Sequence, residues 1–392
     1  MNRRTFLRTS ALLGGGSLAS LATCGLSSEA GRKTTEPKLS EIEDSERFER
    51  LHRQLTVADS YSACVEIDDL ERAGTDVVFQ AMESEELLVR LPPKSSSQPP
   101  PAGLDTWENV FKGNDVVRRV TESIQAQLKA IDAEPNRIAL ARDGSEIESV
   151  VQTGRIALVL MLKSGWISDR LEVLRNYHDL GVRVMALCHL AAFSWSDSTA
   201  ERNRIPGLSA FGREVVSECN RLGLLVDLSH ASDETARHAL EVSKRPLIAS
   251  HSNCRALSGS YRDLNDETIR AIAKNGGVVS VLAATPRTST ERHIARLRRD
   301  RRLAKKYSDP FELASAKRRD AIVWGTKLNL AHIDHVVRLV GIEHVGVASH
   351  CTSVPQWREF TEVLVRHGYR QDEVKKILGL NVLRVFKEAV AK

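Results

Sequence analysis

The feature that most constrains the fold of this chain is a regular alternation of short apolar runs with amphipathic segments from residue 55 onward. Runs of this length, bounded by turn residues, are typical of buried strands. The eight runs are Leu55–Ala58, Val77–Gln80, Ile156–Leu162, Val182–Leu187, Leu224–Leu228, Leu247–Ser250, Gly277–Leu282 and His344–Ala348.

The segments between these runs have helical signals. Asp233–Val242 starts with acidic residues, Asp266–Lys274 places apolar residues on one face before a Gly pair, and Leu330–Val340 stops at a Gly. Eight strands that alternate with helices predict an α/β chain folded as a closed parallel (β/α)8 barrel of the TIM type. A doubly wound open sheet is the alternative.

The composition fits one large domain or two ordinary ones, with 392 residues of which 42% are hydrophobic. No apolar run of 18 or more residues follows the N-terminus, which excludes a polytopic membrane protein. We predict a barrel domain over residues 49–392, preceded by an export signal over residues 1–26 and a polar linker over residues 27–48.

The export signal is predicted from a pair of arginines, Arg3 and Arg4, followed by a weak apolar stretch. This pattern is typical of a twin-arginine signal, and a disordered basic start is the alternative. Small residues favour cleavage after Ala22, whereas a lipoprotein-like sequence ending at Cys24 would instead give a lipid anchor. The protein is therefore expected to be exported, and to be periplasmic or membrane-associated.

The positive charge of the chain is concentrated in residues 287–319. This segment has twelve Lys and Arg against four Asp and Glu, so its +8 leaves −3 for the rest of a chain whose formal net charge is +5. A nucleic-acid binder with a basic surface throughout is therefore not expected. Within it, Arg292–Lys306 has arginines at helical spacing and is interpreted as a solvated helix, with contact to an anionic surface as the alternative.

Four histidines immediately follow apolar runs: His189, His230, His251 and His350. In a parallel barrel the carboxyl ends of all strands open on one face, where catalytic groups gather. Imidazole is the commonest protein metal ligand and also transfers protons near neutral pH. The pattern indicates a barrel of the metal-dependent hydrolase kind, although a single histidine in such a place is more often a core residue.

Longer motifs resemble those of the membrane (renal-type) dipeptidases, a family of zinc peptidases with a (β/α)8 barrel. The most specific match is Gly207–Gly212 followed by Asn220–His230. Further matches are Ile248–Ser252, Tyr261–Leu264 and His332–Val347. On these motifs the chain is identified as a member of the family.

The resemblance implies roles for four retained residues. His230 and His251 match two histidines that bind one of the family's two zinc ions, and His189 matches a histidine thought to polarise the oxygen of the tetrahedral intermediate. Arg262 matches an arginine that engages the substrate carboxylate, for which the fork of a guanidinium is suited. The resemblance also implies a small-peptide substrate and a homodimer.

Other positions of the family's site are substituted. Tyr61 and Ala63 stand where the first strand supplies a His and an Asp ligand, and Lys163 stands at the place of the bridging glutamate. His350 takes the place of an aspartate that handles the nucleophilic water. Two zinc ions need carboxylates to offset their charge, so we expect that the family's two-zinc site does not assemble.

A site with one zinc ion per chain at most is predicted instead, on His230, His251 and His350, with a fourth position for water. Cys188 and Cys351 are alternative soft ligands, and Tyr61 either orients water or fills the vacated volume.

Three hypotheses follow for the exported protein. The first is a metallohydrolase of dipeptides or related small amides with this altered site. The second is a non-catalytic dipeptidase homologue that binds a carboxylate-bearing ligand or partner, and the third is a scaffold whose histidines only satisfy buried hydrogen bonds.

Overall fold

A computed structural model describes residues 47–62, 67–82, 114–190, 192–200, 206–282, 306, 329–350 and 357–391. The predicted signal, nearly all of the linker, Cys24, Ala63, Cys351 and all but one residue of the basic segment 287–319 lie outside the described residues. The strands are β1 (Ala58–Ser62), β2 (Val77–Met82), β3 (Ile138–Leu140), β4 (Ile156–Leu162), β5 (Val182–Ala186), β6 (Leu225–Asp227), β7 (Ile248–Ala249), β8 (Val278–Leu282) and β9 (Val345–Ala348).

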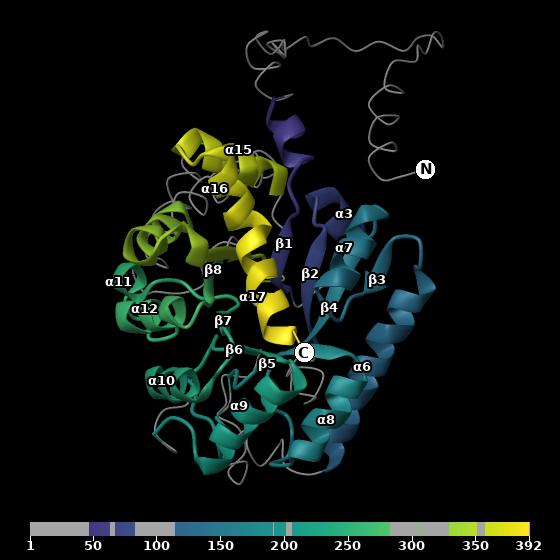
Figure 1. Cartoon of the computed structure of the whole chain (residues 1–392), viewed down its shortest axis with the longest axis vertical. Helices are drawn as coiled ribbons and strands as arrows, with labels where there is room; N and C mark the ends of the chain where they lie inside the picture. The colour runs from purple at the N-terminus through teal and green to yellow at the C-terminus, as the bar shows by residue number, and fades with distance from the viewer. Residues whose placement is uncertain are drawn as a thin grey trace.

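Helices follow or precede most of these strands and surround them (Figure 1). They are α3 (Ile67–Ala73), α6 (Asn114–Ala133), α7 (Gly144–Gln152), α8 (Leu171–Asp179), α9 (Ala210–Leu222), α10 (Asp233–Val242), α11 (Arg255–Ser258), α12 (Asp266–Lys274), α15 (Trp357–His367), α16 (Gln371–Lys375) and α17 (Asn381–Val390). A further helix covers 329–340, a 3-10 turn covers Ile342–His344, and a π-helix covers Lys376–Leu380.

The strands pair in parallel and in chain order, β1-β2-β4-β5-β6-β7-β8-β9, while β3 pairs only with β4. A doubly wound sheet would reverse its strand order at a switch point, and this order has no reversal. The predicted (β/α)8 barrel is therefore confirmed and the open-sheet alternative is wrong.

Side chains as well as backbone groups close the barrel between β9 and β1. The His350 N–H donates to the Tyr61 carbonyl at 3.1 Å. The Ser60 hydroxyl lies in the barrel interior, 2.8 Å from the Val347 carbonyl oxygen and 2.7 Å from that of Ser250. One small polar residue of the first strand thus links two strands from the C-terminal part of the chain.

The first strand begins three residues later than the predicted Leu55–Ala58. The Leu55 N–H donates to the His52 carbonyl, so this residue still belongs to the turn that ends a helix over residues 47–52. The strand instead continues through Ser60, Tyr61 and Ser62, which are buried although two of them are polar. The short β3 had no counterpart among the predicted strands.

Local capping explains the ends of several helices. Asp143, Ser209, Ser232 and Asn265 each accept backbone N–H groups at the start of α7, α9, α10 and α12. Gly223 ends α9 in the left-handed conformation, with φ of 76°. These signals lie within a few residues of each helix end, so the sequence alone places α10 and α12 at their observed bounds.

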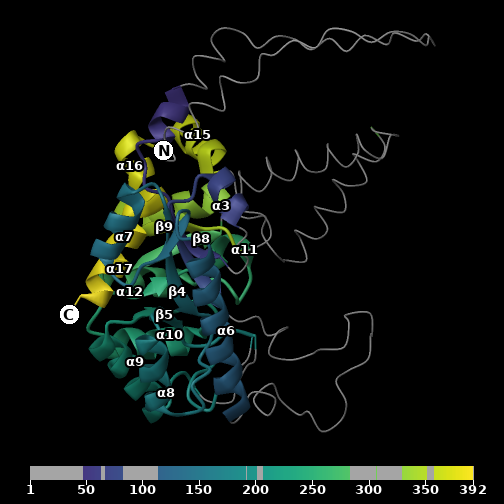
Figure 2. The ribbon, with the colours of Figure 1, turned by 90° about the vertical axis from the view of Figure 1, so that its right-hand side faces the viewer.

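The C-terminal helix α17 closes the amino end of the barrel. Its apolar residues join the interior cluster of strand side chains, and the Phe386 ring packs edge-on against Phe79 with ring centroids 5.3 Å apart. Asn381 donates to the carbonyls of Ile342 and Val345, just before β9 and at its start. Figure 2 shows α17 and α11 on opposite sides of the strands, so the strand ends followed by histidines open away from α17.

The π-helix before α17 lies directly against the start of β1. A Cβ added at Gly379 would lie 1.9 Å from the Thr56 carbonyl oxygen, which is backbone and cannot rotate away. We therefore expect Gly379→Ala to lower the free energy of unfolding by about 1–3 kcal/mol, the usual cost of overpacking. Urea denaturation followed by circular dichroism measures this change.

The matched control is Gly144→Ala, because the atoms that its Cβ would meet belong to the flexible side chain of Lys387. That variant should unfold within about 0.5 kcal/mol of the wild type. Equal unfolding free energies for Gly379→Ala and the control would contradict the tight contact between the π-helix and β1.

Candidate functional site at the barrel mouth

The four strand-end histidines lie together at the carboxyl end of the barrel. Adjacent ring centroids are 4.2 Å apart for His189 and His230, 5.2 Å for His230 and His251, and 5.2 Å for His251 and His350. The parallel topology brings them together because each follows a different strand, namely β5, β6, β7 and β9. Their sequence positions, up to 161 residues apart, show only that each follows an apolar run.

Two of these histidines have a strained backbone. His230 has φ of 70° and His350 has φ of 56°, in the left-handed region that residues with a Cβ rarely adopt. Such conformations cost about 1–3 kcal/mol and persist where surrounding contacts enforce them, commonly at functional sites.

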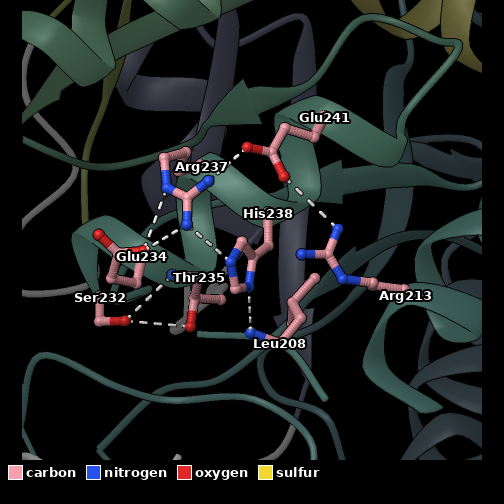
Figure 3. Close-up of polar contacts among 8 residues, drawn as sticks. All are labelled: Leu208, Arg213, Ser232, Glu234, Thr235, Arg237, His238 and Glu241. Carbon is pink, nitrogen blue, oxygen red and sulfur yellow. Dashed lines mark hydrogen bonds and ion pairs between the residues drawn. The ribbon is translucent and has the colours of Figure 1, made fainter. Parts of the chain in front are cut away.

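The segment after His189 is attached to α10, which follows His230. Ser198 donates to the His189 carbonyl at 2.6 Å, and Thr235 of α10 donates to the Asp197 carbonyl at 3.0 Å. Figure 3 shows a second attachment, where the Leu208 N–H donates to Nδ1 of His238 at 3.0 Å. These contacts fix the segment around His189 relative to His230.

A buried hydrogen-bond chain orients His251. The Ser250 hydroxyl donates to Oδ2 of Asp227 at 2.6 Å and lies 2.7 Å from Nδ1 of His251. Because its single proton points to the carboxylate, the hydroxyl accepts from Nδ1–H of His251. Nε2 of His251 then carries a lone pair, and it lies 3.2 Å from Nε2 of His230.

This proton assignment also gives the donor and the acceptor in the hydrogen bond between His230 and His251 when no metal is bound. Nε2–H of His230 donates to Nε2 of His251, which leaves Nδ1 of His230 as an acceptor. Among the described residues nothing donates to this buried nitrogen. Desolvation, followed by the charge of Arg262 and the neighbouring imidazoles, holds the pKa of His230 well below its usual value.

Asp227 is held in place by three donors. Its Oδ1 accepts the backbone N–H groups of Ser229 and Ser250 at 2.9 and 2.8 Å, in addition to the Ser250 hydroxyl on Oδ2. Burial raises the pKa of this carboxyl and the hydrogen bonds oppose that rise. Asp227 was not among the predicted site residues, although it lies three residues before His230.

Tyr61 lies within the cluster, at the position where the resemblance implies a histidine ligand. Its ring stacks on His251 at a centroid distance of 3.7 Å and on His350 at 5.3 Å. The ring is buried, so it fills space between two strand ends. The two roles considered for Tyr61, orienting water and filling vacated volume, both stay predictions.

Two cations lie at the same mouth. Lys163 directly follows β4 and is partly exposed. Arg262 donates to the Ser252 hydroxyl at 3.0 Å and to the His251 carbonyl at 2.8 Å. Desolvation lowers the pKa of Arg262, and neither cation forms an ion pair with a carboxylate of the described residues.

These donors do not fit the zinc centre that the family implies. In the part of the chain that the structure describes, no group of three or more His, Cys, Asp or Glu side chains is arranged to hold a metal ion. The 3.2 Å separation of the two Nε2 atoms suits neighbouring zinc ligands, but a tetrahedral zinc takes four donors. The zinc site on His230, His251 and His350 stays a prediction.

Cys188, the alternative soft ligand, would bind a metal as a thiolate, and this alternative stays a prediction. Its side chain is fully buried, and desolvation raises its pKa to about 12. The thiol instead donates to the Asp197 carbonyl at 3.4 Å.

A second buried carboxylate, Asp59, lies at the end of the barrel's closing seam. Its Oδ1 accepts the backbone N–H groups of Ser349 at 2.9 Å and Tyr61 at 3.3 Å, while its Oδ2 has no partner among the described residues. Desolvation raises its pKa to about 7, against the lowering effect of these hydrogen bonds. Asp59 therefore connects Tyr61 of β1 with Ser349, which directly follows β9.

The family profile and two curated relatives that match this chain are all of dipeptidases. The profile of the family described as Membrane dipeptidase (Peptidase family M19) matches residues 46–392. An uncharacterized dipeptidase of Schizosaccharomyces pombe is 31% identical over 72% of this chain, and Dipeptidase verJ of Clonostachys rogersoniana is 30% identical over 70%. The chain matches 62% and 68% of the length of these two relatives.

Solved structures show the same fold at lower identity. The probable dipeptidase PvdM from Pseudomonas aeruginosa superposes with a TM-score of 0.69 at 20% identity, covering 89% of this chain and 99% of that one. A metallo peptidase from Rhodobacter sphaeroides, liganded with a phosphinate mimic of the dipeptide L-Ala-D-Ala, gives 0.65 at 19% identity, covering 86% and 99%. Among the described helices, none has the length and apolar composition needed to cross a membrane.

The raised pKa of Asp59 predicts a pH dependence of stability. The unfolded carboxyl titrates near 3.8 and the folded one near 7, so the folded state binds more protons between these values. Its contribution to the free energy of unfolding therefore falls as pH rises through this window, by about 4 kcal/mol in total. Urea unfolding at pH 5, 6, 7 and 8 should show a shallower fall with pH for Asp59→Asn than for the wild type.

Asp132→Asn serves as the control, because Asp132 is exposed on α6. It should keep the pH dependence of the wild type. The same dependence in Asp59→Asn would contradict the assigned titration.

Proposed function

Because this chain belongs to the membrane dipeptidase family, we propose that it binds a small peptide or another carboxylate-bearing ligand at the barrel mouth without the family's pair of zinc ions. The observation that carries this proposal is the set of hydrogen bonds that Arg262 forms, together with the absence of an ion pair between it and a described carboxylate. Two of its N–H groups donate to Ser252 and His251, and no described carboxylate pairs with its charge. A guanidinium has five N–H donors, so a fork remains for a bound carboxylate.

The surroundings of Arg262 support this role. The charges of Asp263 and Asp227 oppose the desolvation of Arg262, but neither carboxylate forms an ion pair with it. A desolvated cation is costly, so a ligand carboxylate that pairs with it would bind tightly. The mouth contains imidazoles and a lysine where the family has metal-bound carboxylates, so its charge suits an anion better than a second cation. The dipeptide mimic bound to the Rhodobacter sphaeroides structure agrees with a ligand of this size.

In this proposal the residues of the mouth bind and orient the ligand. Arg262 holds the carboxylate, and His189 lies beside the His230–His251 pair to face the rest of the ligand. The stacked Tyr61 ring limits the space on the side of β1 and β9. The proposed protein is a non-catalytic dipeptidase homologue.

The second candidate is hydrolysis of dipeptides or related small amides with one zinc ion. It is favoured by the Nε2 separation of 3.2 Å between His230 and His251, which is close to the spacing of two nitrogen ligands on one tetrahedral ion. The two candidates differ in metal content and in turnover.

We expect Ala-Ala to bind the purified protein after dialysis against a chelator, with saturable heat in calorimetry and no hydrolysis. Ala-Ala amide, which lacks the carboxylate, should bind at least about tenfold more weakly, since a charge-assisted hydrogen bond contributes about 1.5–3 kcal/mol. Arg262→Gln should remove the preference for the free acid.

Arg270→Gln is the matched control, because it removes an exposed guanidinium on the outer helix α12. This variant should bind as the wild type does. Bound zinc together with turnover, both lost in His230→Ala, would replace the proposal with the second candidate. Absence of both metal and ligand binding would leave the scaffold hypothesis.

We also propose export by the twin-arginine route to the periplasm or membrane surface, supported by Arg3 and Arg4 ahead of a short apolar stretch. Replacing both by Lys should retain the unprocessed protein in the cytoplasm, as cell fractionation would show. Arg8→Lys, outside the arginine pair, should leave export unchanged. Normal export of the double variant would exclude this route, and loss of lipid labelling in Cys24→Ala would indicate an anchor at that residue.

A further inference from the structure

The barrel mouth contains a second cation that Arg262-mediated binding does not require. Lys163 follows the last residue of β4, where the strand ends at the mouth, and its side chain is partly exposed. No hydrogen bond or ion pair joins it to the other described residues.

The described carboxylates at the mouth interact with groups other than the two cations. Asp227 accepts three hydrogen bonds from Ser229 and Ser250. Asp263 accepts the Asn253 N–H at 3.3 Å, and Asp59 is buried under the seam with its pKa raised to about 7. None of the three forms an ion pair with Lys163 or Arg262 within the described ranges.

We infer that the ligand of this site has two anionic groups, one held by Arg262 and the other by Lys163. This inference rests on the proposed function and specifies its ligand class. The two cations lie at different strand ends of the same mouth. Lys163 directly follows β4, and Arg262 is hydrogen-bonded to His251 and Ser252 after β7. A single carboxylate would neutralise only one of them, whereas a dipeptide with an acidic side chain neutralises both.

A lysine is suited to bind the second anionic group of the ligand, and an arginine is suited to bind the first. Its ammonium is a point charge on a flexible stem, so it accepts anionic groups over a range of distances, whereas the planar fork of Arg262 requires a fixed approach. We therefore expect the carboxylate at Arg262 to fix the ligand, and Lys163 to select ligands that carry a further negative charge.

The test compares two ligands of nearly equal shape that differ by one charge, Ala-Glu and Ala-Gln, by calorimetry on the metal-free full chain. The wild type should bind Ala-Glu at least about tenfold more tightly, the effect of one charge-assisted contact. Lys163→Gln should bind both ligands equally and with the wild-type affinity for Ala-Gln. Lys163→Arg should keep the preference, and Lys274→Gln, which removes an exposed lysine of α12, should behave as the wild type.

The outcomes separate this inference from the proposed function. Equal wild-type affinity for the two dipeptides overturns the inference and leaves carboxylate binding intact. Equal weakening of both ligands in Lys163→Gln also overturns it, because Lys163 would then not select for charge. Loss of both ligands in Arg262→Gln, with lost preference alone in Lys163→Gln, supports both. Failure of the wild type to bind either ligand overturns both.

Discussion

The arrangement of the barrel mouth depends on two buried carboxylates that connect neighbouring strand ends. Asp227 accepts backbone N–H groups on both sides of the gap between β6 and β7, and Asp59 does the same between β1 and β9. Short parallel strands such as β7 have few ladder hydrogen bonds, so these side chains supply links that the backbone does not. These links fix the positions of His230, His251 and His350, which follow directly after the linked strand ends.

The charge of the mouth distinguishes this chain from the metal centre that its family implies. A pair of divalent ions is stabilised by carboxylates, and the sequence resemblance implies that Lys163 and Tyr61 stand at ligand positions of the family. The Tyr61 ring stacks on His251 and on His350, so it packs between strand ends of the mouth. Nε2 of His230 and both ring nitrogens of His251 take part in hydrogen bonds, whereas Nδ1 of His230 has no partner among the described residues.

The two ends of the barrel differ in the polarity of their buried groups. At the amino end, α17 places Phe386 and its other apolar residues against the interior side chains of the strands, which gives a dry packed core. At the carboxyl end, buried polar atoms such as Nδ1 of His230 and Oδ2 of Asp59 have no partner among the described residues. Such groups lower stability, and they are commonly found where a protein binds a ligand.

The sequence by itself determined the fold class, the family, the bounds of helices such as α10 and α12, and the set of histidines at strand ends. These features depend on periodicity and capping over a few residues, or on motifs that can be read along the chain. Only the tertiary structure decided the true position of β1, the pairing of β3, and the network around the histidines. Ser349 and Asp59, for example, are 290 residues apart, and no local pattern indicates that the backbone of one donates to the carboxylate of the other. Parallel strands meet through long connections, so contacts at their ends are fixed by the closure of the whole barrel.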